Sequence, residues 1–148
     1  MSDTQRKGLT HPWDTPPAFG EAIEVAEGVL WSRLPLPMKL DHVNVYALDD
    51  GSSWTVIDTG FASRKSKGIW QKMMEGPLAG KPIARVVVTH HHPDHMGLAG
   101  WLQSEFGAEL VTTRTAWLMA RMLTLDVQDV PSAEALTFYK RSGMDAGR

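Results

Sequence analysis

One apolar run restricts the fold more than any other part of the sequence. Residues 83–88 read Ile-Ala-Arg-Val-Val-Val, and a short β-branched run of this kind predicts a strand buried on both faces of a sheet. Apolar residues then recur at helical spacing, at Leu98, Trp101, Leu102 and Phe106. The alternation of strand and helix signals along the chain indicates an α/β layered fold.

Four residues of metal-ligating type follow this strand within six positions, and they are His90, His92, Asp94 and His95. In extended chain, residues i and i+2 point the same way, so His90 and His92 can converge on one ion. Pro93 disfavours helical geometry at His92, and Asp94 and His95 then begin a helix. Neutral imidazole and carboxylate suit borderline divalent metals such as zinc. The cluster therefore predicts a metal site, whereas the simpler interpretation is a solvated polar loop.

The other histidines have a different interpretation. The side chain of His91 is expected to point away from those of its two neighbours, so it is not counted as a ligand. His11 and His42 are isolated and are interpreted as solvated side chains. Residues 96–148 contain no histidine, so any further histidine ligand would come from elsewhere.

The motif Thr-His-x-His-x-Asp-His at residues 89–95 resembles the signature of the metallo-β-lactamase superfamily. The resemblance implies that His90 and His92 bind a first metal, and that Asp94 and His95 bind a second. It also implies a catalytic role for Asp94 in orienting the nucleophile. The bound ions are expected to be Zn²⁺, two per complete site, with iron or manganese as alternatives.

A second match lies at residues 54–60, Trp-Thr-Val-Ile-Asp-Thr-Gly, which resemble the family's earlier strand ending in Asp-x-Gly. The resemblance implies that Asp58 holds the metal loop by hydrogen bonds without binding metal. Taken alone, Asp58 followed by Thr59 and Gly60 is equally typical of a turn.

The resemblance implies an αββα sandwich, of which this chain covers only the N-terminal half. Residues 1–20, which are rich in proline and threonine, are expected to form a flexible arm, and residues 21–148 the N-terminal part of a hydrolase domain whose C-terminal half is absent. The implied reaction is attack of a metal-activated water on an ester, thioester or related bond of a small molecule. Because the family's remaining ligands are missing, we expect this chain alone to be inactive.

The family resemblance is to a zinc-dependent, glyoxalase II-like branch, and two alternatives stay open. The chain could be a non-catalytic metal-binding or partner-dependent protein, or it could belong to the mononuclear-iron sulfur dioxygenase or endoribonuclease branches of the same fold. An uncovered sheet face would favour self-association. The net charge of −2 gives no electrostatic reason to expect nucleic acid or a membrane as a partner. The absence of cysteine and of a signal peptide favours a cytoplasmic location.

Local signals predict the remaining elements. A turn at Glu27-Gly28 should join two strands within residues 23–34. Further strands are expected at residues 43–48, 53–58 and 109–112. Helices are expected at residues 63–75, after Thr113 and after Ser132. Gly97 and Gly100 would weaken a helix by about 1 kcal/mol each relative to alanine. Close packing beneath the metal loop would explain them, and so would ordinary helix–sheet packing.

Overall fold

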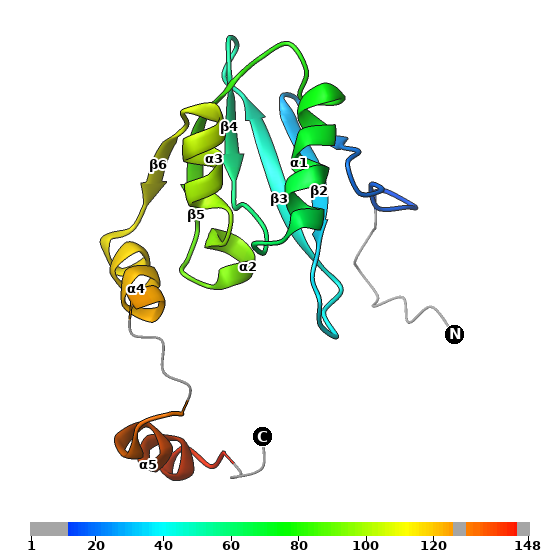
Figure 1. The fold of residues 1–148 in the computed structure, drawn as a ribbon. Coiled ribbons are helices and arrows are strands. Elements are labelled where there is room, and N and C mark those ends of the chain that lie inside the picture. Colours follow the sequence, from blue (N-terminus) through cyan, green and yellow to red (C-terminus); the bar gives the residue numbers. More distant parts are fainter. Residues whose placement is uncertain (1–11, 126–129, 145–148) are drawn as a thin grey trace.

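The computed structural model of the chain describes residues 12–125 and 130–144. Within these residues, six strands and five helices follow one another (Figure 1). In chain order they are β1 (Ile23–Ala26), β2 (Val29–Pro35), β3 (His42–Asp49), β4 (Trp54–Ile57), α1 (Arg64–Glu75), β5 (Ile83–Val88), α2 (Pro93–Met96), α3 (Ala99–Phe106), β6 (Glu109–Thr112), α4 (Arg114–Leu125) and α5 (Ala133–Arg141).

All six strands form one sheet, whose spatial order β1-β2-β3-β4-β5-β6 is the order of the sequence. The first four strands pair antiparallel, whereas β4, β5 and β6 pair parallel. The predicted α/β class is confirmed, and each strand lies within a few residues of its expected position. The predicted helix at residues 63–75 is α1, whose first turn is capped by the Ser63 side chain accepting from Ser66 N at 3.0 Å.

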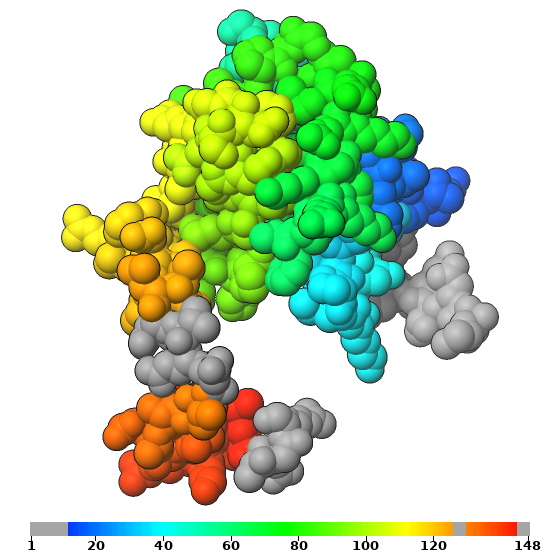
Figure 2. All heavy atoms as spheres, in the orientation of Figure 1, coloured from blue at the N-terminus to red at the C-terminus, as the bar shows by residue number. Residues whose placement is uncertain are grey.

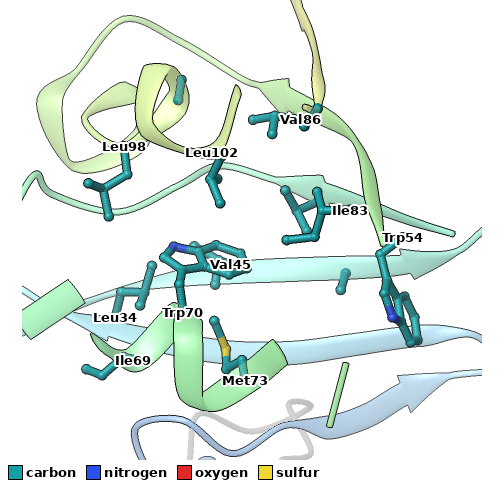
Figure 3. Close-up of a cluster of buried hydrophobic side chains, with 14 of the residues drawn as sticks. Leu34, Val45, Trp54, Ile69, Trp70, Met73, Ile83, Val86, Leu98 and Leu102 are labelled. Carbon is teal, nitrogen blue, oxygen red and sulfur yellow. The ribbon is translucent and has the colours of Figure 1, made fainter. Parts of the chain in front are cut away.

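Helices α1 and α3 cover the same face of the sheet (Figure 1). Their side chains meet those of the central strands in one buried cluster, which Figure 3 shows. Trp70 and Met73 of α1 are each 1% exposed, so these residues belong to the core and not to a cofactor site. Leu102 of α3 and Val86 of β5 are fully buried in the same cluster. This packing fixes the strand ends that carry the predicted site.

The opposite face of the sheet carries a continuous apolar row that crosses every strand. Direct register partners make up this row, and in spatial order they are Ile23, Trp31, Tyr46, Ile57, Val87 and Val111. None of the six is buried, and Tyr46 and Val111 are more than one-third exposed. Among the described residues, no helix lies on this face (Figure 1). We refer to it as the open face.

The open face leads to a prediction about assembly. We expect the chain to self-associate through this face, and Val87→Glu to weaken the association at least tenfold because a charge would be buried in an apolar contact. A concentration series in the analytical ultracentrifuge would measure this, with Gln71→Glu on the exposed side of α1 as the control. A chain that sediments as a monomer at every concentration would contradict the prediction.

Part of the predicted flexible arm packs against the sheet. Residues 1–11 lie outside the described residues. Beyond them, the Trp13 ring lies 6.1 Å from that of Trp31, between ring centroids, and the backbone oxygen of Pro17 accepts a 3.0 Å hydrogen bond from Arg33 Nε. Pro17 is itself buried. These contacts hold residues 12–17 beside β1 and β2, where Trp13 lies against the Trp31 part of the open face.

The last two helices have few buried residues. Ala116 is the one buried residue within the described range of α4, and α5 has none in its own. Large apolar residues of α4 are exposed, among them Trp117, Leu118, Met122 and Leu125. In Figures 1 and 2, α5 lies apart from the sheet and its covering helices. Across the described parts of the chain, no helix has the length and hydropathy needed to cross a bilayer.

Candidate metal centre

The predicted ligands lie at one end of the sheet, where β4 and β5 reach their carboxyl ends. The loop formed by residues 89–92 connects β5 to the short helix α2, next to the turn that follows β4 (Figure 1). Parallel strands β4 and β5 are neighbours, so their ends bring Asp58 and Thr89 together. Crevices outside the carboxyl ends of strands are the usual ligand sites of α/β sheets.

Asp58 connects the two strand ends through a set of hydrogen bonds. Its Oδ1 accepts from the backbone N–H of Thr89 at 2.8 Å, and Thr89 Oγ1 lies 2.9 Å from both carboxylate oxygens. Its Oδ2 accepts from His95 Nδ1 at 2.7 Å. Asp58 is 6% exposed and has a positive φ of 62°, a conformation that aspartate adopts more readily than most residues. The carboxylate therefore fixes both ends of the loop that carries the histidines.

The hydrogen bond to Asp58 also determines which nitrogen of His95 is available. An ionised carboxylate only accepts hydrogen bonds, so Nδ1 of His95 carries the proton. In the neutral ring, Nε2 then has the free electron pair, which is the form that binds metals. Nε2 lies 3.3 Å from Asp94 Oδ2. Two electron-pair donors at this separation repel each other unless a cation lies between them.

Thr59 is a contributor that the sequence interpretation missed. Its N–H and its hydroxyl both donate to the backbone oxygen of His95, each at 2.8 Å, and its hydroxyl also accepts from Leu98 N at 3.0 Å. Its own backbone oxygen accepts from Trp70 Nε1 at 2.8 Å. Thr59 is fully buried, so these bonds join α2 firmly to β4 and α1. A threonine between Asp58 and Gly60 was the only signal for this role, and it is also typical of a turn.

Two glycines, Gly97 and Gly60, allow close packing beneath the loop. A Cβ atom on Gly97 would lie 2.3 Å from the Pro93 oxygen, 2.8 Å from Ala62 N and 2.9 Å from the Gly60 oxygen. Gly60 has a φ of 85°, and a Cβ there would lie 2.5 Å from Leu34 Cδ1. Close packing beneath the metal loop therefore accounts for Gly97.

The histidine rings form a compact group. The ring centroid of His90 lies 4.6 Å from that of His92 and 4.0 Å from that of His95. Burial, followed by the neighbouring His95 and His92 rings, lowers the pKa of His90. His90 therefore stays neutral to lower pH, and a neutral imidazole is the form that binds metal. His92 is the exposed member of the group.

The imidazole nitrogens and carboxylate oxygens of the loop are suitable ligands for a divalent metal ion. The described residues do not, however, provide a complete coordination site. No three His, Asp or Glu side chains of residues 12–125 and 130–144 are arranged to hold a single ion. The 3.3 Å between His95 Nε2 and Asp94 Oδ2 does match two neighbouring ligands of a tetrahedral ion, whose bonds are about 2.0–2.2 Å long. The loop thus provides a partial ligand set.

The remaining histidines are not proposed ligands. The ring of His91 packs edge-on against that of His92, with centroids 5.0 Å apart. His91 also lines a groove between the loop and α4, on which neither His90 nor His92 borders. His42 begins β3 and contacts the carboxylate of its neighbour Asp41. His11 lies outside the described residues.

Comparison with known proteins identifies the family. The family model described as the metallo-beta-lactamase superfamily matches residues 38–138, which is more than half of the chain. The chain belongs to the metallo-β-lactamase superfamily. The matched segment of this superfamily member includes Asp58 and the whole of the histidine loop.

Individual relatives agree with this assignment. The superfamily member is 34% identical over 73 residues to a probable metallo-hydrolase, YqjP, of Bacillus subtilis strain 168. It is also similar to a crystal structure of a β-lactamase domain protein from Burkholderia ambifaria, with a TM-score of 0.69 and 38% identity over 76% of this chain. A metallo-β-lactamase family protein from Thermus thermophilus has the same fold, with a TM-score of 0.63 and 23% identity over 81% of this chain.

The superfamily member is much shorter than these proteins. Its match covers 49% of this chain and 23% of the Bacillus protein. In the two solved structures the match covers 38% and 40% of the respective chains.

Proposed function

We propose that this chain provides part of the centre of a metal-dependent hydrolase that acts on an ester, thioester or related bond of a small molecule. In this proposal His90 and His92 hold one metal, Asp94 and His95 hold another, and zinc is the resident ion. When bound, the metal would lower the pKa of a coordinated water towards about 7 and so supply hydroxide. The partial ligand set and the superfamily assignment support this proposal.

The contacts of Asp58 carry the proposal. Its carboxylate accepts hydrogen bonds from Nδ1–H of His95 and from the N–H and the hydroxyl of Thr89, so the loop is held in place without metal. His95 Nε2 is thereby held next to Asp94 with its electron pair free. A solvated polar loop is not expected to bury a carboxylate such as Asp58 against His95, because burying a charge costs free energy. It is also not expected to place the second nitrogen of His95 next to Asp94, whereas a metal site is.

The roles proposed for the chain's own residues follow from these positions. His90 and His92 bind through neutral rings, which the lowered pKa of His90 favours. The free carboxylate oxygen of Asp94 accepts a hydrogen bond from the attacking water and orients it. Asp58 keeps the proton on Nδ1 of His95 and does not contact substrate.

One observation favours a partner-dependent form of the same centre. The described residues contain no closed group of three ligands, and we propose that turnover needs donors beyond them, for which a second copy is one source. We therefore propose that the chain alone binds metal but has little activity. A glyoxalase II-like substrate and a cytoplasmic location, which a sequence without cysteine fits, belong to the same proposal.

Metal binding tests this proposal without depending on turnover. We expect His92→Ala and Asp94→Ala each to reduce zinc binding by at least tenfold, because each removes one ligand of a partial set. Isothermal titration with zinc would measure the loss, and native mass spectrometry would count the ions per chain. His91→Ala is the matched control, because it removes an imidazole of the same loop that packs on His92 but is not a proposed ligand. Zinc binding that is equally strong in all three variants would contradict the ligand assignment.

A further inference from the structure

A groove lies beside the histidine loop, and none of the four proposed metal ligands lines it. Its volume is about 630 Å³. Its walls come from the loop and α2, from α3, from β6 and from α4, which stands beside α2 in Figure 1. A volume of this size suits a small organic molecule. We refer to it as the α3–α4 groove.

The lining of the α3–α4 groove is apolar, with a few polar groups. Met96, Leu110, Trp117 and Leu123 provide its large apolar surfaces. Gln103, Thr124 and His91 add hydrogen-bonding groups. A lining of this kind accepts a hydrocarbon or aromatic body and orients it by a small number of polar contacts.

The formal charge that lines the groove is positive. Of the described residues that line it, Arg121 is the only formally charged one, and none is an aspartate or glutamate. The guanidinium carbon of Arg121 lies 5.9 Å from the centre of the Trp117 ring, which places the cation next to an apolar wall. An anionic group on an apolar molecule would therefore find its complement here, and a cationic ligand would not.

We propose that the α3–α4 groove binds an amphipathic carboxylate, with its apolar body along Trp117 and Leu123 and its carboxylate on Arg121. This site is separate from the proposed hydrolytic centre and does not depend on it. His91, Pro93, Met96 and Gly97 line the groove and also belong to the segment that carries the metal ligands. A bound carboxylate would consequently contact the histidine loop through these residues.

Decanoate below its critical micelle concentration is a suitable probe, with 1-decanol and acetate as partial probes. We expect decanoate to bind more tightly than either, because only decanoate has both the chain and the charge. Arg121→Gln should weaken decanoate binding about tenfold and leave decanol unchanged, since one charge-assisted contact is lost. Arg114→Gln, which alters an arginine of the same helix that does not line the groove, should have a smaller effect.

Metal-free protein titrated in ¹H–¹⁵N spectra would give both the affinity and the place of binding. The expected shifts are at the Trp117 indole, at His91 and at Leu123. Shifts confined to the exposed apolar residues of α5, such as Phe138, would overturn the proposal, because decanoate would then be acting as a surfactant. An unchanged affinity in Arg121→Gln would also overturn it. Because no metal is present, neither outcome bears on the hydrolase proposal.

Discussion

Replacing Gly97 by alanine is expected to destabilise the fold by about 2 kcal/mol or more. The backbone of Gly97 is already helical, with φ −57° and ψ −34°, so alanine meets no conformational penalty there. The new methyl group would instead lie 2.3–2.9 Å from backbone atoms of Pro93, Ala62 and Gly60. Backbone atoms cannot move aside as the end of a flexible side chain can, so α2 would be displaced from the turn after β4.

Gly100 provides a matched control for this prediction. It lies in α3, three residues further along, and a Cβ atom there would have no atom within 4 Å. Alanine at this position should stabilise the chain by up to about 1 kcal/mol through helix propensity alone. Urea unfolding of both variants, followed by circular dichroism, would compare them. Equal stability of Gly97→Ala and Gly100→Ala would mean that α2 is not tightly packed against residues 60–62.

Replacing Asp58 by asparagine is expected to lower both stability and metal affinity. The carboxamide has the same shape but only one acceptor oxygen, whereas the carboxylate of Asp58 accepts from Thr89 and from His95 Nδ1. We expect a loss of about 2 kcal/mol in the unfolding free energy of the metal-free protein, since buried donors lose their partner. Chemical unfolding in the presence of a chelator would measure this loss separately from metal binding.

The same substitution should lower zinc affinity about 10–100-fold, even though Asp58 is not a proposed ligand. If the carboxamide N–H donates to His95 Nδ1, the ring proton moves to Nε2, which then cannot bind metal. Asp50→Asn is the matched control, because Asp50 also accepts a hydrogen bond from a threonine hydroxyl, that of Thr55, at the other end of β4. Zinc affinity that is equal in both variants would show that Asp58 does not control the state of His95.

The sequence was sufficient to predict the elements that local rules control. Thr113 begins α4 as expected, and its side chain accepts from Ala116 N at 3.1 Å. The helix expected at residues 63–75 is capped by Ser63, which accepts from Ser66 N at 3.0 Å. Gly107 ends α3 in the left-handed conformation, with a φ of 68°. Each of these features involves residues a few positions apart, so the pattern of residue types contains the information needed to find it.

Features that depend on distant segments were not predicted. The break between α2 and α3 lies at Leu98, whose N–H donates to the hydroxyl of Thr59, a residue 39 positions earlier in the chain. The role of Thr59 depends likewise on the backbone of His95. Spacing identified four residues of metal-ligating type, and the lack of histidine after His95 already indicated an incomplete ligand set. Spacing could not show which ring nitrogen of His95 would face Asp94. That outcome depends on side-chain directions, which the spacing of residues alone does not determine.

The strand order has a consequence for how the chain folds as it is synthesised. Because each strand lies beside its predecessor, every pairing can form as soon as the next strand emerges. The three antiparallel pairings from β1 to β4 close short loops, whereas β5 and β6 require longer crossovers through helices, which are slower to close. We therefore expect Asp58, at the end of β4, to be in place early. The histidine loop would then fold onto a carboxylate whose position is already set.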